Sequence, residues 1–272
     1  MYLGIDVGGT KTLVASLTND GVITESIKFP TPAKYADFLE QLSETIHSLK
    51  AKEFRAIGLA LPGIVDRDLG MGIAYGNLAW QKVPAVADIE RMTHTPVVID
   101  NDANLAALSE AMLLKEEFSV VLYATIGTGI GTGIIVDQKI DKTYEDAEGG
   151  QMLFEHKGKL VKWESFASGH GFYERFGKKL SDITDAATLK IIGKDIALGL
   201  QSLIAMTQPD VIVLGGGVAT HLPKFEKYLV AELQRYETPL TKIPPIRQAQ
   251  RPEEAVVYGC YDIAKEKYGH TA

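Results

Sequence analysis

The most constraining feature of this sequence is the hairpin-like stretch at its start. It opens with the run LGIDVGGTKT (residues 3–12), in which an apolar strand meets one carboxylate and then a pair of glycines. A second strand-like run, LVASL (residues 13–17), follows at once. Two apolar runs separated by glycines predict a β-hairpin with a glycine turn.

The turn of this hairpin can be interpreted in two ways. Gly8 and Gly9 would let the backbone take a positive φ and approach a ligand closely. Their amides, with the Thr10 hydroxyl and Lys11, could bind phosphate, and Asp6 would sit where a magnesium ion or its water shell needs an oxygen ligand. A tight hairpin whose polar residues only cap the turn accounts for the same residues equally well.

Hydrophobic periodicity predicts alternating strands and helices, which is typical of an α/β fold. The predicted strands span 2–7, 12–18, 21–28, 56–61, 96–99, 120–126, 133–136 and 211–214. The predicted helices span 35–52, 83–92, 104–115, 166–179, 186–207, 222–234 and 253–267. Segments 64–83 and 137–163 are irregular, and 239–252, with four prolines, is a loop or an edge strand.

The β-β-β-α-β-α-β-α pattern of the first 110 residues restarts in the second part of the chain. A shift of 119 residues places Asp6 on Thr125 and Gly8 on Gly127, and both segments read as strand, Gly/Thr turn, strand. We interpret this as an internal duplication. Two phosphate-binding hairpins facing each other would grip a nucleotide between two lobes.

Two further glycine-rich turns are candidates for nucleotide binding. Glycine occupies every second position from 127 to 133, which indicates close approach of a ligand to the backbone, although a flexible hairpin tip is the alternative. The triplet at 215–217 follows an apolar strand and precedes a helix. It would let a flat ligand such as a purine lie against the backbone, near a helix N-terminus.

Aspartate or asparagine fills four of the five positions from 100 to 104, between a buried strand and a helix. Ligands gather at the carboxyl ends of parallel strands, and a carboxylate there can act as a general base. Helix capping needs one such residue, so the excess favours a site. Glu148 and Gln151, on a glycine-kinked segment, and Glu164 are weaker candidates, for which a solvated loop is the simpler interpretation.

Composition excludes several functional classes. The net charge of -7 and pI near 5.4 argue against nucleic acid as the main partner. A single cysteine, Cys260, excludes an internal disulfide and a multi-cysteine zinc site, and fits a reducing cytoplasm. No signal-peptide pattern precedes the first strand, and no apolar run approaches the ~18 residues that a membrane span needs.

Five motifs, in order along nearly the whole chain, resemble the ROK family of sugar kinases and repressors, within the actin-like ATPase superfamily. They are GIDVGGTKT (4–12), LPGIVD (61–66), NDANLAA (101–107), GTGIG (127–131) and LGGGV (214–218). The resemblance implies a two-lobed actin-like ATPase (ribonuclease H-like) fold, with duplicated βββαβαβα domains around a central cleft. Residues 1–110 plus 256–272 would form a small lobe that binds sugar and phosphate, and 111–255 a large lobe that binds nucleotide.

The resemblance also implies roles for individual residues. Asp102 would take the proton from a sugar hydroxyl as it attacks the γ-phosphate of ATP. The sugar would be held by Gly63, Asn77, Asn101, Asp102, Glu148, Gln151 and Glu164. Phosphates, magnesium and adenosine would be held by Asp6 (the magnesium ligand, through water), Gly8, Gly9, Thr10, Lys11, Gly127, Thr128, Gly129, Gly215, Gly216 and Gly217.

The sequence departs from the family pattern in three places. Gln151 stands where the family usually has a histidine that contacts the sugar, and glutamine cannot carry charge. The cysteine-rich zinc motif is absent from 152–163, so we expect no structural zinc. Nothing precedes the first strand, whereas the repressor branch has a helix-turn-helix there, which favours the kinase branch.

We therefore expect a cytoplasmic, ATP- and magnesium-dependent kinase of a hexose or related sugar, glucokinase-like, acting without nucleic-acid or membrane partners. A homodimer is compatible with the resemblance. The main alternative is a non-catalytic sugar sensor or degenerate family member. An ATPase of the actin or heat-shock type and a DNA-binding repressor are the remaining rivals.

Overall fold

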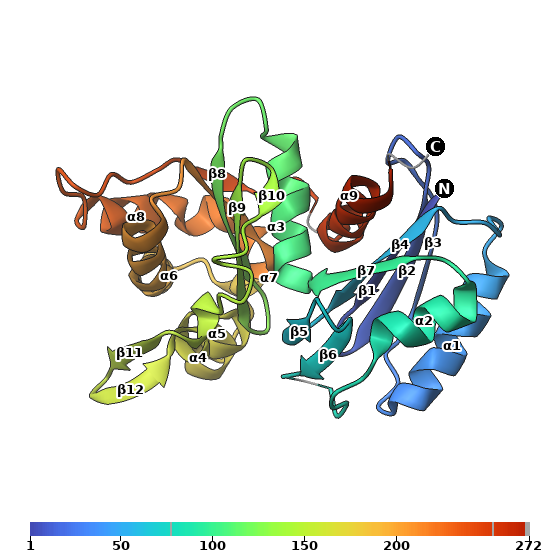
Figure 1. Cartoon of the computed structure of the whole chain (residues 1–272). Helices are drawn as coiled ribbons and strands as arrows, with labels where there is room; N and C mark the ends of the chain where they lie inside the picture. The colour runs from blue at the N-terminus through green and yellow to red at the C-terminus, as the bar shows by residue number, and fades with distance from the viewer. Residues whose placement is uncertain (77, 252, 270–272) are drawn as a thin grey trace. The chain divides into compact units, whose positions relative to one another are not determined.

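The computed structural model describes residues 1–76, 78–251 and 253–269 and divides into two compact units (Figure 1). Unit 1 comprises Met1–Ser109 and Glu254–Ala272, and unit 2 comprises Glu110–Glu253. Each unit contains a five-stranded mixed sheet with helices packed on it. The α/β fold with two sheet-containing lobes is therefore confirmed, whereas the binding role predicted for each lobe stays a prediction.

The sheet of unit 1 has the strand order β3-β2-β1-β4-β7. Its strands are β1 (Tyr2–Val7), β2 (Lys11–Leu17), β3 (Ile23–Pro30), β4 (Ala56–Leu61) and β7 (Val97–Asn101). The first three form an antiparallel meander, and β4 and β7 extend the sheet in parallel with β1. A small hairpin of β5 (Ile64–Asp66) and β6 (Met71–Ala74) lies within the predicted irregular segment.

The strands of unit 1 bury a different set of side chains on each face of the sheet. Helices α1 (Tyr35–Ser48) and α2 (Ala85–Thr93) cover one face, where Leu3, Ile5 and Val7 join the core (Figure 1). Helix α9 (Ala255–Tyr268) covers the other face, where it packs against Tyr2 of β1. Because side chains alternate along a strand, β1 presents Asp6 on the α9 side.

Glycine allows α9 to approach the sheet closely. A Cβ atom at Gly58 would lie 2.0 Å from the Cys260 carbonyl oxygen, and one at Gly4 would lie 2.9 Å from the Val257 carbonyl oxygen. These distances are too short for any side chain. The last helix of the chain is therefore packed directly on backbone of the first and fourth strands.

The sheet of unit 2 repeats the topology of unit 1, with the order β10-β9-β8-β13-β14. Its strands are β8 (Val120–Ile126), β9 (Ile130–Val136), β10 (Lys139–Ile140), β13 (Val211–Gly215) and β14 (Ile246–Gln248). Here too a meander is extended by two strands parallel to the first. Adding 119 to the bounds of β2 gives those of β9, which supports the duplication that we inferred from the sequence.

Unit 2 folds around a core to which Trp163, Phe166 and Phe172 contribute. Its helices are α4 (Trp163–Ala167), α5 (Gly169–Phe176), α6 (Ala186–Thr207), α7 (Gly216–Ala219) and α8 (Leu222–Gln234). Helix α3 (Asp102–Leu113) begins in unit 1 and ends in unit 2. The prediction of one helix over 166–179 is wrong, because Ser168 is extended and its side chain caps α5 by accepting from the Gly171 amide.

The predicted irregular segment 137–163 contains a hairpin at the place of the missing cysteine motif. It consists of β11 (Leu153–His156) and β12 (Lys159–Lys162). The His156 ring stacks on Phe166 at 4.4 Å between centroids, and Phe154 meets Phe166 edge-on. Aromatic packing thus attaches the hairpin to α4.

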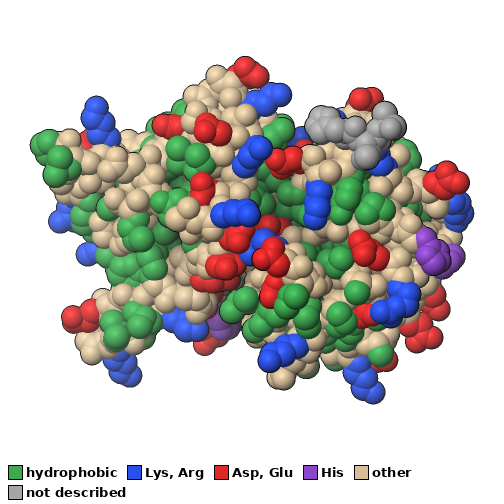
Figure 2. Space-filling view, in the orientation of Figure 1, with side chains coloured by type: hydrophobic (Ala, Val, Ile, Leu, Met, Phe, Trp, Pro, Cys, Tyr) green, Lys and Arg blue, Asp and Glu red, His purple; other side chains and the backbone are tan. Residues whose placement is uncertain are grey.

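Two surface properties follow from the described residues. None of their helices is both long and apolar enough to cross a membrane. On the face drawn in Figure 2, Lys and Arg side chains are scattered singly among Asp and Glu.

Candidate active site

Asp100 lies near the end of β7, in the corner where the chain passes from β7 into α3, and it is the acceptor on which the hydrogen bonds of this corner converge. Arg67 donates to both of its carboxylate oxygens, from Nε and Nη2, at 2.9 Å each. Asp100 Oδ1 also accepts from Asn104 Nδ2 at 3.0 Å and from the Asn101 amide at 2.7 Å. Asp100 and Asn104 are buried, so both serve to hold this corner together. The sequence analysis did not identify Arg67, and nothing in the residues around it sets it apart.

Asn101 caps α3, as the simpler interpretation of this stretch predicts. Its Oδ1 accepts from the Ala103 amide at 2.8 Å, and its Nδ2 donates to the Gly63 carbonyl at 2.8 Å. Gly63 has a φ of 80°, and a Cβ there would lie 2.2 Å from the Ala74 carbonyl oxygen. Only glycine fits this position. Asn101 therefore links α3 to the Gly63 turn, and its predicted contact with sugar stays a prediction.

Asp102, the first residue of α3, lies near Asp6. Its Oδ1 accepts from the amide of Ala103 at 2.8 Å. Burial and the negative charge of Asp102 together raise the pKa of Asp6 from 3.8 to about 7, against a smaller lowering by Lys28. The two carboxylates are thus close enough to repel each other.

This pair of carboxylates fits a divalent cation, because a cation would relieve the repulsion that raises the pKa of Asp6. Carboxylate oxygens are the ligands that magnesium prefers, usually one or two from the protein with water completing the shell. Within residues 1–76, 78–251 and 253–269, no cluster of three or more His, Cys, Asp or Glu side chains has the arrangement of a protein-only metal site.

The first glycine turn is closed by hydrogen bonds of its own. The Gly8 amide donates to the Lys11 carbonyl at 2.9 Å, and Thr31 Oγ1 donates to the Gly8 carbonyl at 2.8 Å. The positive φ that we predicted is not present at Gly8 or Gly9. Thr31 is a supporting residue that the sequence analysis missed. The predicted phosphate contacts of Gly8, Gly9, Thr10 and Lys11 stay predictions.

In unit 2 the structure brings Glu148, Gln151 and Glu164 together. Gln151 Nε2 donates to Glu164 Oε1 at 2.8 Å. Burial, then the charge of Glu164, then that of Asp146, raise the pKa of Glu148. Three residues that were weak candidates in the sequence therefore form one cluster of hydrogen-bond acceptors, with the Gln151 amide held by Glu164.

Short contacts with β9 place this cluster beside the second glycine turn. The Gly149 amide donates to Thr132 Oγ1 at 3.0 Å, and a Cβ at Gly150 would lie 2.1 Å from the Ile130 carbonyl oxygen. A Cβ at Gly129 would lie 2.7 Å from Glu164 Oε2. The turn predicted to bind phosphate and the residues predicted to bind sugar are thus in contact.

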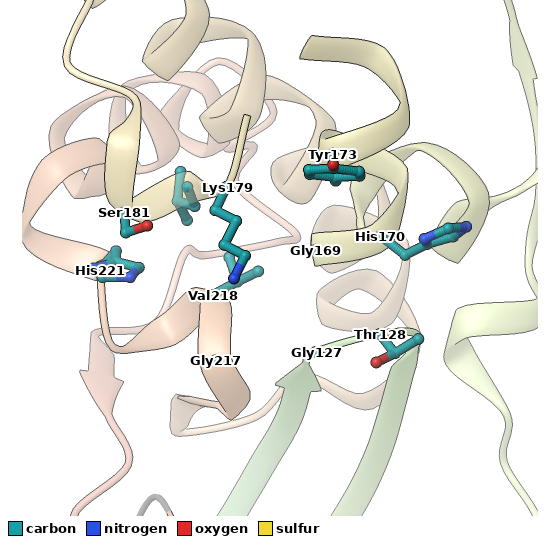
Figure 3. A pocket seen from close by; sticks show the side chains of 11 residues that line it. Gly127, Thr128, Gly169, His170, Tyr173, Lys179, Ser181, Gly217, Val218 and His221 are labelled. Carbon is teal, nitrogen blue, oxygen red and sulfur yellow. The ribbon is translucent and has the colours of Figure 1, made fainter. Parts of the chain in front are cut away.

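A cavity of about 570 Å³ adjoins the same turn (Figure 3). Figure 3 shows the Lys179 side chain extending into it, with Tyr173 on one side and the Gly217 turn below. None of its described lining residues is acidic. They are Gly127, Thr128, Gly169, His170, Tyr173, Lys179, Leu180, Ser181, Gly217, Val218 and His221. Gly127, Thr128 and Gly217 carry predicted nucleotide roles, and Val218 belongs to the LGGGV motif; the others come from segments without a recognisable ligand spacing.

The three glycines at 215–217 have different reasons to be glycine. A Cβ at Gly215 would lie 2.1 Å from the Tyr123 hydroxyl oxygen. Gly216 has a φ of 77°, and its Cβ would lie 2.6 Å from the Ile126 carbonyl oxygen. At Gly217 a Cβ would meet no atom within 4 Å. The first two glycines are required by packing, and only Gly217 faces the cavity. Of the predicted site residues, Asn77 lies outside the described residues.

Comparison with known proteins returns one family over almost the whole chain. A sequence model of the ROK family matches residues 2–267. A Bacillus subtilis protein with a provisional fructokinase name is 33% identical over 235 residues, 80% of this chain and 77% of that protein. The N-acetyl-D-glucosamine kinase of Vibrio cholerae is 27% identical over 95% of this chain and 98% of its own length. A solved ROK family glucokinase from Streptomyces griseus, in complex with glucose and AMPPNP, superposes with a TM-score of 0.82 at 22% identity, covering 97% of this chain and 99% of that one.

Proposed function

The chain belongs to the ROK family, and from that premise we propose that it is an ATP-dependent sugar kinase whose general base is Asp102. One observation carries the assignment of the base. Of the Asp and Asn residues at 100–104, Asp100 and Asn104 are buried in the corner network and Asn101 caps the helix. Asp102 is the partly exposed carboxylate at this end of β7, and it lies near the proposed magnesium ligand Asp6.

Asp102 would accept the proton of the sugar hydroxyl as its oxygen attacks the γ-phosphate of ATP. Proton removal at that moment raises the nucleophilicity of the oxygen without requiring an alkoxide in solution. The partial exposure of Asp102 leaves it reachable by a substrate. Phosphoryl transfer otherwise depends mainly on positioning and charge stabilisation, so one base is sufficient.

The sugar would be oriented by acceptor groups of the chain. Glu148 and Glu164 would accept hydrogen bonds from sugar hydroxyls, and Gln151, held by Glu164, would present its carbonyl oxygen. Gly63, Asn77 and Asn101, from the first 110 residues of the chain, would also contact the sugar. Gln151 cannot add a positive charge where the family's histidine can, so we propose a neutral hexose or related sugar, glucokinase-like, as substrate.

The donor would be held by the glycine turns and the cavity. The turns Gly8–Lys11 and Gly127–Gly129 would bind phosphate oxygens through amides other than those of Gly8 and Gly127, which close the turns themselves. The cavity of about 570 Å³ is large enough for a nucleoside. Asp6 would hold magnesium through water, and the ion would supply charge neutralisation on the phosphates. We further propose a cytoplasmic location.

The test is ADP release from Mg-ATP across glucose, mannose, fructose, allose, N-acetylglucosamine and N-acetylmannosamine. We expect one sugar or a narrow group to stimulate release, and Asp102→Asn to lower kcat by about 10²- to 10⁴-fold because the proton loses its acceptor. Asp37→Asn is the matched control, since it also removes a carboxylate from the first turn of a helix, α1, where the side chain is exposed.

The rivals predict different results in the same assay. Normal turnover in a stably folded Asp102→Asn protein would remove Asp102 as the base. Binding of sugar and ATP without ADP release would favour a sugar sensor, in line with the glutamine at 151. ADP release that no sugar changes would favour an ATPase of the actin or heat-shock type.

A further inference from the structure

Unit 2 contains a second cavity, of about 470 Å³, that shares no lining residue with the one in Figure 3. It is bounded by the tip of the β11–β12 hairpin, the end of α5, one face of α6 and the residue Tyr236 after α8. None of the residues predicted to bind sugar or nucleotide that the structure describes lines it. The lining residues that matter below are Glu155, His156, Lys157, Arg175, Lys194 and Asp195.

A largely buried ion pair forms one wall of this cavity. Arg175 Nη1 contacts Asp195 Oδ2 at 2.7 Å, and the two side chains are 17% and 11% exposed. The guanidinium also lies over the Phe176 ring at 5.0 Å from the centroid. Asp195 therefore offsets the charge of Arg175, and it also lies within the electrostatic reach of Lys194.

The other cations around the cavity are Lys157, at the turn of the hairpin, and Lys194, on α6. Among the described residues neither lysine forms an ion pair, and the remaining acidic lining residue is Glu155. The cavity thus has a positive surplus in a chain whose net charge is -7. Lysine, arginine and imidazole groups are hydrogen-bond donors suited to phosphate and carboxylate oxygens.

The same ion pair is hydrogen-bonded to the helix that carries Glu164. Arg175 Nη1 donates to the carbonyl of Phe166 at 2.7 Å, and Trp163 Nε1 donates to the carbonyl of Asp195 at 3.0 Å. Trp163 and Phe166 are both residues of α4. A ligand that draws Arg175 toward the cavity therefore changes the hydrogen bond between Arg175 and α4. Because α4 carries Glu164, a shift of α4 also moves the Gln151 side chain that Glu164 holds.

We propose that this cavity is an effector site for a small metabolite bearing a phosphate or carboxylate group, and that its occupancy changes sugar affinity through α4. The binding part of the proposal stands on the cavity, its charge and its donors. The coupling part rests on the proposed function, because it requires Glu164 and Gln151 to bind sugar.

Trp163 provides a readout of binding that does not depend on activity. The chain has two tryptophans, and Trp80→Phe in unit 1 leaves Trp163 as the single reporter. Among the described residues Trp80 Nε1 has no hydrogen-bond partner, so replacing Trp80 by Phe removes no hydrogen bond. Inorganic phosphate and acetate are titrated separately into the full-length Trp80→Phe protein, and Trp163 emission is followed.

We expect a saturable change in emission with at least one anion. Saturation by phosphate alone identifies a phosphate ester as the natural ligand, and saturation by acetate alone identifies a carboxylate. Lys194→Glu in the same background should raise the apparent Kd at least about tenfold, because it reverses one charge of the cavity while both side chains of the Arg175–Asp195 pair stay in place. Lys227→Glu, an exposed change on α8 outside the cavity, should leave the Kd unchanged.

Two results would overturn the binding proposal. One is no saturable change with either anion. The other is an equal Kd in the Lys194→Glu and Lys227→Glu proteins, which would place the anion elsewhere, such as at the glycine turns. The coupling is measured separately, as the affinity for the stimulating sugar with and without saturating anion. An unchanged sugar affinity would overturn the coupling while leaving the binding result and the kinase assignment intact.

Discussion

Burying Asp6 beside the negative charge of Asp102 destabilises the metal-free protein. The ordinary pKa of 3.8 rises to about 7 in the folded state. Above pH 7 the group is charged in both states, and the folded state bears the full repulsion. As the pH falls from about 7 toward 4, the folded protein takes up a proton that the unfolded chain does not, so this penalty disappears.

We therefore predict that Asp6→Asn stabilises the protein while abolishing its chemistry. In magnesium-free buffer at pH 8 the free energy of unfolding should rise by about 2 kcal/mol, and the gain should vanish near pH 4. Urea denaturation at several pH values measures this. Magnesium should stabilise the wild-type protein at pH 8 and not the variant. An equal stability difference at every pH would contradict the explanation.

Arg67 is expected to position Asp102 through Asp100 without touching substrate. Lysine cannot reproduce the two parallel bonds to Asp100, so Arg67→Lys should lower kcat by roughly 10- to 100-fold with a smaller change in sugar KM. The matched control is Arg91→Lys, in the pair of an exposed Arg91 with Asp88, which should change neither. Kinetics well below the unfolding temperature separate positioning from stability. A lowered Tm with normal kcat would assign Arg67 a structural role only.

The residues at 100–104 also show how much of the site could be predicted from the sequence. The excess of Asp and Asn at 100–104 predicted a ligand site, because one cap cannot use four such residues, and that site stays a prediction. It could not show that Asp100 and Asn104 form a buried network, since Arg67, the partner of Asp100, comes from a loop 33 residues earlier. Periodicity and spacing carry no information on such a pairing.

At the scale of elements, the turn from β13 into α7 offers two neighbouring glycines with opposite roles. Gly216→Ala should lower the free energy of unfolding by about 2 kcal/mol or more, because of its positive φ and the 2.6 Å contact with Ile126. Gly217→Ala should leave stability nearly unchanged and weaken ATP binding, since its Cβ would enter the cavity. Thermal unfolding and nucleotide titration of both variants test this pair. Equal ATP affinity of wild type and Gly217→Ala would exclude Gly217 from the donor site.

Long periodic elements were predictable, and short ones were not. The bounds predicted for 186–207 and 222–234 are those of α6 and α8, because apolar residues repeat at helical spacing through both. The hairpin of β11 and β12 has a turn at Lys157 and Gly158, both with positive φ, but its alternation is too short to stand out. Ser168 broke the predicted helix because its cap outweighs the helical pattern around it.

At the scale of the whole molecule, the duplication was predictable because a hairpin with a glycine turn leaves the same signal in both halves. The shared strand order of the two sheets extends the likeness beyond those hairpins. The return of α9 to the first sheet followed only from the family resemblance. The glycines that permit it look like ordinary strand residues in the sequence.

The close packing of α9 makes Gly58 a sensitive position. We predict that Gly58→Ala lowers the free energy of unfolding by ~3 kcal/mol or more, because its Cβ would lie 2.0 Å from the Cys260 carbonyl oxygen and α9 must move. Gly76→Ala in the same unit is the control, since its Cβ would meet nothing within 4 Å. Chemical denaturation measures both. A Gly58→Ala protein as stable as the control would mean that α9 contributes little to unit 1.

The packing of α9 on β1 and β4 also sets an order of events during synthesis. Unit 2 is continuous in sequence, so it can fold as soon as residue 253 has left the ribosome. The first 109 residues cannot complete their core until the last helix emerges, roughly 10–30 s after residue 109 itself at ordinary rates of translation. During that interval one face of the first sheet, including the strand that carries Asp6, lacks its cover. The segment that contains the proposed base is thus also the one that we expect to wait longest for its complete core.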